Sequence, residues 1–343
     1  MLQVKSYNII LCGLLLLAAG CKKTDEPQQP LTPVTLQCTQ PAFLKQGDKV
    51  ALISPSYFTP MENVEKTADL LRSWGLEPVV GPNVGKVVDG KYAGTVAERV
   101  SDIRWAMSAP DIKAILCNRG GYGTIQLINE LTFDELSATP KWLIGFSDIT
   151  ALHCYFQAEG FASIHGPMGR HLTEEPADDF ASEALRKLLF GEYQDKKSLI
   201  SYTCNAHPLN HRGKAEGMLR GGNFAVYYGL RGTRYDIPPE GTILFIEDVG
   251  ERPHVVERML YNLRIGGILD RISGLILGQF TEYEENMGLG KELYGALADV
   301  VKGYHIPICF DFPVGHVTAN YPLIEGSRVK LEVGKQTKLT ILR

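Results

Sequence analysis

The chain has 343 residues, of which 44% are hydrophobic and 22% charged, and its formal net charge at pH 7 is −4. This composition is typical of a globular protein large enough to bury a sizeable core in one or two domains. No basic run is present, so we expect no nucleic-acid partner. The function must therefore be read from local sites and not from bulk charge.

The N-terminus is typical of an export signal. Residues 1–21 contain one early basic residue, then an apolar stretch too short to span a bilayer as a mature helix, then small residues before Cys21. The ending Leu-Ala-Ala-Gly-Cys resembles a bacterial lipobox, which implies lipidation at Cys21. We expect an exported protein anchored by lipid to the cell envelope, periplasmic or on the outer membrane. An ordinary secretory signal or a simple membrane anchor is the alternative.

Residues 22–42 follow the predicted signal and are interpreted as a tether. Their first half is polar and rich in proline, which is typical of a flexible, partly extended spacer.

Five cysteines remain beyond the signal. Cys117, Cys154 and Cys309 lie in apolar surroundings and are predicted to be small buried hydrophobic residues. Cys38 and Cys204 are candidates for a disulfide in an oxidising compartment, although the sequence does not show that they are close. No C-x-x-C pair occurs, so neither a zinc ribbon nor a thioredoxin-like site is indicated, and we expect no metal and no cofactor.

Predicted strands and helices alternate over residues 43–172. The strands are expected at 49–54, 78–80, 112–117 and 142–146, and the helices at 60–74, 96–107, 123–131 and 149–157. This alternation predicts an α/β domain with a mostly parallel sheet flanked by helices.

The pattern changes after this first domain. Residues 173–205 are acidic and then helical, and we interpret them as a linker. From residue 206 to 343, short strands dominate, which predicts a second, β-rich domain. Its strands are expected at 214–219, 242–248, 275–280, 308–314 and 328–333, with helices at 223–230 and 254–264.

The stretch KWLIGFSDIT, residues 141–150, is the most informative. An apolar strand runs into Gly145, then Ser147, then a predicted helix. A strand-to-helix turn of this kind holds a serine hydroxyl at the sheet edge, and nearby backbone N–H groups can stabilise an anion. The second glycine of the G-x-S-x-G pattern is missing. The alternative is that Ser147 or Asp148 only caps the helix.

A glycine-rich loop, NRGGYG at 118–123, directly follows another predicted strand. Gly120 and Gly121 allow the backbone to approach a ligand closely, which favours an oxyanion or carboxylate cradle beside Ser147. A phosphate loop is a rival interpretation, but the G-K-[ST] ending and the G-x-G-x-x-G spacing are both absent.

Two further predicted strands end in candidate catalytic residues. Glu247 and Asp248 close one strand, and because neighbouring strand residues point to opposite faces, one of them is expected to face a site and the other solvent. His316 follows the other strand. A serine, a base and an orienting carboxylate together can activate a serine hydroxyl. Taken singly, a solvated strand end or a helix cap explains the acids equally well.

Motifs along residues 45–335 resemble the LD-carboxypeptidase family of serine peptidases, which includes muramoyl-tetrapeptide carboxypeptidases and microcin self-immunity peptidases. The matching stretches are Gly47–Pro55, NRGGYG, IGFSDIT, HGPM, LRGGN, LFIEDVGERPHVVERML and PVGH. The resemblance implies a flavodoxin-like N-terminal domain and a swivelling β/β/α-type C-terminal domain, with the active site between them. It also implies a homodimer without a metal.

The same resemblance implies a role for each candidate residue. Ser147 is the expected nucleophile, His316 the general base and Glu247 the orienting acid. The expected reaction is hydrolysis of the terminal L,D-peptide bond of a muropeptide tetrapeptide, with release of D-alanine. Backbone N–H groups of Asp148 and of the Gly120–Gly121 loop are expected to hold the oxyanion. Arg119 and Arg220 are candidates for binding the substrate carboxylate, although a structural salt bridge explains either arginine equally well.

Other functions stay open from the sequence. A non-catalytic lipoprotein that binds cell-wall peptides, or a peptidase that acts on a peptide antibiotic, would carry many of the same features. An α/β-hydrolase esterase shares the order serine, acid, histidine, although the missing glycine and the β-rich second half argue against it. Two departures from the family stand out: Ile324 stands where proline is common, and many members are cytoplasmic, whereas this chain carries an export signal.

Overall fold

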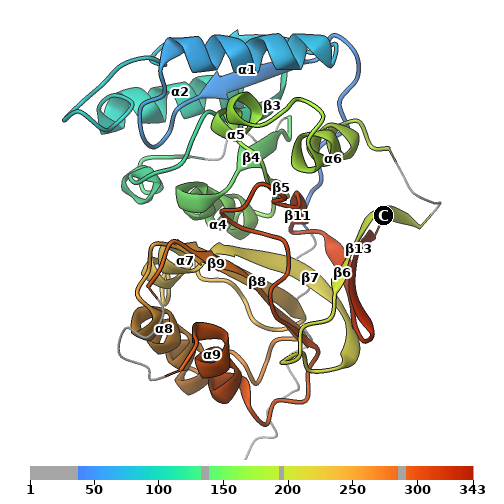
Figure 1. The fold of residues 1–343 in the computed structure, drawn as a ribbon. Coiled ribbons are helices and arrows are strands. Elements are labelled where there is room, and N and C mark those ends of the chain that lie inside the picture. Colours follow the sequence, from blue (N-terminus) through green and yellow to red (C-terminus); the bar gives the residue numbers. More distant parts are fainter. Residues whose placement is uncertain (1–37, 133–138, 193–196, 285–290, 343) are drawn as a thin grey trace, which may run out of the picture. The chain divides into compact units, whose positions relative to one another are not determined.

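The computed structural model describes residues 38–132, 139–192, 197–284 and 291–342 (Figure 1). The predicted signal, the candidate lipidation residue Cys21 and most of the predicted tether lie outside these residues. Within the described ranges no helix is both long and apolar enough to cross a membrane.

The first sheet has six strands in the order β11-β5-β4-β3-β1-β2. Five of them are parallel and β11 runs antiparallel to β5, so the sheet is mixed but mostly parallel. The order 2-1-3-4-5 of the parallel strands is that of flavodoxin-like sheets, which confirms the predicted fold class. The strands are β1 (Lys49–Ile53), β2 (Glu77–Val80), β3 (Ile112–Cys117), β4 (Trp142–Gly145), β5 (Ser163–His165) and β11 (Leu323–Glu325).

The helices of this part arise from apolar residues at helical spacing. In α1, for example, Val64, Ala68 and Leu71 are buried three to four residues apart. Helix α2 begins at a capping box in which Thr95 and Glu98 satisfy each other's backbone N–H groups. The helices are α1 (Met61–Ser73), α2 (Val96–Ser108), α4 (Thr150–Ala158), α5 (Gly169–Glu174) and α6 (Phe180–Leu189), with 3₁₀ turns η1 (Thr124–Gln126) and η2 (Ser147–Ile149).

The helix predicted at 123–131 is wrong, since only the 3₁₀ turn η1 forms there. Thr124 explains the difference. Its backbone N–H donates to the carboxylate of Asp148 at 3.0 Å, and its hydroxyl donates to the carbonyl of Asp148. These bonds tie the segment to the turn after β4.

The second sheet has seven strands in the order β10-β9-β8-β7-β12-β13-β6, with parallel pairing from β7 to β10 and antiparallel pairing from β7 to β6. The second half is therefore β-rich, as predicted. Its strands are β6 (Ser198–Asn205), β7 (Gly213–Asn223), β8 (Thr242–Val249), β9 (Gly274–Thr281), β10 (Ile308–Cys309), β12 (Arg328–Val333) and β13 (Gln336–Leu342), and its helices are α7 (Phe224–Gly229), α8 (Pro253–Ile265) and α9 (Leu293–Val301).

Strand β10 is shorter than the predicted 308–314. Asp311 has a φ of 60°, in the left-handed region, which is incompatible with a continuing strand. The chain therefore turns after Cys309 and enters the loop that carries His316.

The segment 173–205, which was expected to be a linker, is largely ordered structure. Helix α6 buries Leu185 and Leu188, and β6 pairs along its length with β13 in the second sheet. In the other direction, β11 leaves the C-terminal half to complete the first sheet beside β5. The chain therefore passes between the two sheets more than once.

Helix α4 joins the two halves. Every residue from Thr150 to Gln157 is buried, and α4 packs against α7 and β7 of the second half, as Figure 1 shows between the two sheets. A helix buried on all sides lies within a shared core. The elements on either side of it are thus held against each other by apolar packing.

The suggested disulfide between Cys38 and Cys204 is not formed. All five described cysteines are free thiols, and the Cys309 thiol donates to the carbonyl oxygen of Phe310 at 3.6 Å. Cys38 lies beside Gly326, where the chain enters β12. The burial predicted for Cys117, Cys154 and Cys309 is confirmed.

Ile324 tests the contribution of β11, since its side chain is fully buried at the junction between the halves. We expect Ile324→Ala to reduce the free energy of unfolding by about 2–5 kcal/mol, because it removes three buried carbons and leaves a cavity. Ile265→Ala is the matched control, since Ile265 is 84% exposed and should change stability by no more than about 0.5 kcal/mol. Urea denaturation followed by circular dichroism measures both, and equal effects would contradict the role of β11.

Candidate active site

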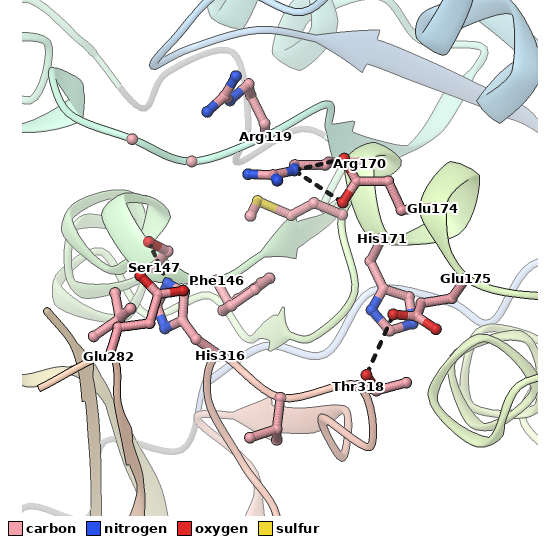
Figure 2. Close-up of a pocket in the computed structure, with 15 residues that line it drawn as sticks. Arg119, Phe146, Ser147, Arg170, His171, Glu174, Glu175, Glu282, His316 and Thr318 are labelled. Atoms are coloured by element: carbon pink, nitrogen blue, oxygen red, sulfur yellow. Dashed lines mark hydrogen bonds and ion pairs between the residues drawn. The ribbon is translucent and has the colours of Figure 1, made fainter.

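Three distant segments bring a serine, a histidine and a glutamate together. The Nε2 atom of His316 lies 3.0 Å from the Oγ of Ser147, and its Nδ1 lies 2.8 Å from Oε2 of Glu247. Ser147 follows β4, Glu247 lies near the end of β8, and His316 lies in the loop after β10. Figure 2 shows the imidazole of His316 facing the Ser147 hydroxyl. The arrangement forms a continuous hydrogen-bonded relay from hydroxyl to carboxylate.

Ser147 is held in an unusual backbone conformation. Its φ is 63°, a left-handed value that costs energy for a residue with a Cβ. Neither Ser147 nor Asp148 makes a side-chain cap to the following helix, so the capping alternative is wrong. The turn is supported from behind by His153, whose Nε2 lies 2.9 Å from the carbonyl oxygen of Gly145. This geometry is that of a serine presented on a sharp strand-to-helix turn.

Glycine at position 315 makes room for the glutamate. Gly315 has a φ of 127°, and a Cβ built there would lie 2.8 Å from Oε2 of Glu247, the oxygen that binds His316. Its backbone N–H donates to the side-chain oxygen of Asn320 at 2.9 Å, which fixes the loop. The PVGH motif therefore requires its glycine so that Glu247 can reach the imidazole.

The surroundings of His316 favour its protonated form. Burial is the largest influence and lowers the pKa of His316. The charge of Glu247, the hydrogen bond to it and the charges of Asp248 and Glu282 together outweigh burial, so the net pKa lies above its ordinary value. Glu247 is fully buried and its Oε1 has no hydrogen-bond partner among the described residues, so its charge is balanced mainly through His316.

Asp248 does not face solvent, contrary to the expectation for the residue beside Glu247. It is only 3% exposed and accepts hydrogen bonds from the side chain of Asn223 at 3.0 Å and from the N–H of Ala225 at 2.9 Å. Burial, and then the nearby charge of Glu247, raise the pKa of Asp248 to about 7. Asp248 therefore fastens the start of α7 to the strand that carries Glu247.

The predicted oxyanion cradle lies beside Ser147. A Cβ built on Gly120 would lie 3.1 Å from the Ser147 hydroxyl oxygen and 3.5 Å from the backbone nitrogen of Asp148. A Cβ on Gly121 would lie within 2.4 Å of the Tyr57 ring. The side chain of Asp148 is occupied elsewhere, since it accepts from the Ser56 hydroxyl at 2.7 Å and so fixes this turn. The glycines allow loop and serine to approach one another.

The relay opens into a cavity of about 580 Å³. Arg119 and Arg170 line the same cavity as Ser147 and His316, and Figure 2 shows the two arginines one above the other, across from Thr318. The predicted alternative, Arg220, is excluded by its position. It is 3% exposed, donates to Gln157 at 3.2 Å and lines a separate cavity.

Arg170 and Glu282 are among the charged cavity residues that were not found from the sequence. Arg170 lies just after the HGPM motif, and Glu282 lies beyond the end of β9 with a φ of 54°. Neither stands in a periodic or glycine-rich pattern, so only the adjacency of Arg170 to a family motif offered a signal. Among the residues that the structure describes, no group of three or more His, Cys, Asp or Glu side chains is arranged to hold a metal ion.

Comparisons with known proteins match both halves of the chain. Residues 50–166 match the LD-carboxypeptidase N-terminal domain and residues 216–331 the LD-carboxypeptidase C-terminal domain. A putative carboxypeptidase of Synechocystis is 35% identical over 295 residues, which cover 85% of this chain and 94% of the relative. The murein tetrapeptide carboxypeptidase of Pseudomonas aeruginosa is 31% identical over 297 residues, covering 82% and 94%. The crystal structure of muramoyltetrapeptide carboxypeptidase from Oxalobacter formigenes has a TM-score of 0.76 at 27% identity and covers 85% of this chain and 98% of that one.

The raised pKa of His316 yields a prediction. In an NMR titration, the imidazole of His316 should lose its proton above the ordinary histidine value of 6.5. Glu247→Gln removes the charge that stabilises the imidazolium, so the pKa should fall. Glu240→Gln is the control, because Glu240 is exposed and paired with Arg271, and it should leave the titration unchanged. A His316 pKa that is the same in wild type and Glu247→Gln would refute the coupling.

Proposed function

Because the chain belongs to the LD-carboxypeptidase family, we propose that it is a serine peptidase that releases the terminal D-alanine of muropeptide tetrapeptides. The observation that carries this proposal is the relay from Ser147 through His316 to Glu247, with hydrogen bonds of 3.0 and 2.8 Å. In this assignment Ser147 is the nucleophile, His316 the general base and Glu247 the acid that orients the imidazole.

The order of the hydrogen bonds, from Ser147 to His316 to Glu247, indicates how the proton moves during the reaction. Nε2 of His316 takes the proton of Ser147 while the serine oxygen attacks the carbonyl of the L,D-peptide bond. The tetrahedral intermediate collapses when His316 gives that proton to the leaving amine of D-alanine. Water then attacks the acyl-enzyme with His316 again as base, and Ser147 is restored. Glu247 stabilises the imidazolium of His316 both in the formation and in the hydrolysis of the acyl-enzyme.

The backbone N–H groups of Asp148 and of the Gly120–Gly121 loop would bind the developing oxyanion. The close approach of Gly120 to both Ser147 and the Asp148 nitrogen supports this role. One such donor typically increases the rate of the chemical step by a factor of about 10²–10³. This contribution is available only in the transition state, so it accelerates the chemical step and does not merely tighten binding.

The strained serine favours catalysis over binding alone. A non-catalytic peptide-binding lipoprotein gains nothing from a serine at a φ of 63° or from a fully buried glutamate behind a histidine. Such features cost stability and are retained where they serve chemistry.

Ser147→Ala is the direct test. We expect the variant to fold and to lose release of D-alanine from a tetrapeptide by about 10⁴-fold or more, because no other group can form the acyl-enzyme. Ser101→Ala is the control, since Ser101 is an exposed residue of α2 and should leave the rate unchanged. Mass spectrometry of the muropeptide before and after incubation measures the reaction. Undiminished release by Ser147→Ala would eliminate the serine mechanism.

We also propose, from the sequence alone, that the protein is exported and lipidated at Cys21. Cys21→Ala should abolish incorporation of labelled palmitate and shift the protein from the membrane to the soluble fraction, because the lipid is the only anchor proposed. Cys38→Ala is the control, since this thiol lies after the predicted signal, in the last part of the predicted tether. Equal membrane retention by the Cys21→Ala and wild-type proteins would oppose the proposal. The homodimer implied by the family likewise stays a prediction, for which sedimentation analysis is the measurement.

A further inference from the structure

The carbonyl oxygen of Gly145, two residues before Ser147, accepts two hydrogen bonds from other elements. One comes from the backbone N–H of Gly166, in the HGPM motif, at 3.0 Å, and it continues the parallel pairing of β4 with β5. The other comes from Nε2 of His153, in α4, at 2.9 Å. The first bond is made by backbone and does not depend on a side chain, whereas the second requires a side-chain donor at position 153.

The contacts of His153 determine which ring nitrogen carries the proton. A carbonyl oxygen can only accept, so Nε2 of His153 must donate to Gly145. Burial lowers the pKa of His153 to about 4, although the bond to Gly145 opposes this effect, so the ring is neutral at pH 7. Its Nδ1 therefore holds a lone pair, and it lies 2.8 Å from the hydroxyl oxygen of Ser163, which donates to it. Ser163 thus selects the tautomer that Gly145 requires.

A buried carboxyl group close to His153 does not disturb this tautomer. Oε1 of Glu325, in β11, lies 3.9 Å from Nδ1 of His153, which is beyond hydrogen-bond distance. Oε2 of Glu325 accepts from the side chain of Gln157 at 2.5 Å. Burial raises the pKa of Glu325 to about 8, so at pH 7 this carboxyl group is mostly protonated and does not call for a charged imidazole.

The turn that follows Gly145 needs support from both ends. Ser147 has a φ of 63°, which costs about 1–3 kcal/mol and persists only where the surroundings hold it. Hydrogen bonds to the side chain of Asp148 fix the downstream end of the turn. At the upstream end, a rotation of the peptide between Gly145 and Phe146 would move the Ser147 hydroxyl. It would also move the ring of Phe146, whose centroid lies 4.9 Å from that of His316 (Figure 2).

We propose that His153 is a positioning residue for catalysis, which holds the hydroxyl of Ser147 in reach of His316 by donating to the Gly145 carbonyl in the tautomer selected by Ser163. The inference rests on the proposed function, since it names what places the nucleophile of that reaction. His153 is fully buried and is not among the residues that line the catalytic cavity. It therefore acts on the rate of the chemical step and not on the binding of substrate.

Two variants of similar side-chain length test the role of the donor. His153→Gln keeps an N–H group that can reach the Gly145 carbonyl, and His153→Met has none. We expect His153→Met to lower kcat by about 10- to 100-fold with KM little changed, because a small displacement of a reacting group has an effect of this size. His153→Gln should recover most of that loss. A steady-state assay of D-alanine release measures both constants.

Cys154→Ala is the control for general loss of stability. Cys154 is the next residue of α4 and is 2% exposed, but it lines a separate cavity. Its truncation should lower the midpoint of thermal unfolding and leave kcat unchanged. Equal kcat values for His153→Gln and His153→Met, or a change confined to KM, would overturn the proposal.

Ser163→Ala tests whether Ser163 acts through His153. The substitution should lower kcat in the wild-type background and have no further effect in His153→Met, because the two changes interrupt the same path. Losses that multiply in the double variant would contradict the assigned path. Should His153→Met not fold, Ser163→Ala alone decides, since it leaves the imidazole in place and frees its tautomer.

NMR separates this inference from the proposed reaction. Correlation of ring nitrogens with ring protons should place the proton of His153 on Nε2 in the wild type and on both nitrogens in Ser163→Ala. The amide resonance of Ser147 should move in His153→Met and return in His153→Gln. If the wild type releases no D-alanine but these results hold, the proposed reaction fails and the positioning of the turn stands. A proton on Nδ1 in the wild type, or an unmoved Ser147 resonance in His153→Met, would overturn the inference whatever the activity.

Discussion

The imidazole of His316 bridges the two halves of the protein, and the geometry of the site depends on its two hydrogen bonds. It hydrogen bonds on one side to Ser147, which follows the first sheet, and on the other to Glu247, in the second sheet. A relay of this kind tolerates little displacement, because a hydrogen bond weakens steeply with distance and angle. The shared core around α4 and the pairing of β11 with β5 keep the two sheets in place.

Close backbone approach is the means by which this junction is built. Gly315 leaves space for the Glu247 carboxylate, and Gly120 lets the neighbouring loop reach Ser147. A Cβ at position 315 would lie 2.8 Å from Oε2 of Glu247, and a Cβ at position 120 would lie 3.1 Å from Oγ of Ser147. The glycines of PVGH and NRGGYG are therefore explained by space at the site, in addition to the turn that Gly315 makes.

Burial of charge is the cost of the arrangement. Glu247 and Asp248 are adjacent acids in an apolar environment, and the structure handles them differently. Asp248 is bound by Asn223 and Ala225, whereas Glu247 relies on the histidine, which raises the pKa of His316. The buried carboxylate of Glu247 stabilises the imidazolium of His316 and so makes the imidazole more basic, which suits a general base.

Local pattern in the sequence determined much of the fold, because strands and amphipathic helices follow from residue spacing. The predicted strand 112–117 is β3, and the α/β and β-rich halves are as expected. Motifs, read through family resemblance, also singled out Ser147, Glu247 and His316. Only tertiary structure decided the rest: that these three meet, that β11 crosses to the first sheet, that Cys38 and Cys204 stay unbonded, and that Arg119 but not Arg220 lines the cavity. The physical reason is that such proximities join residues far apart in the chain, and they depend on packing that no local spacing records.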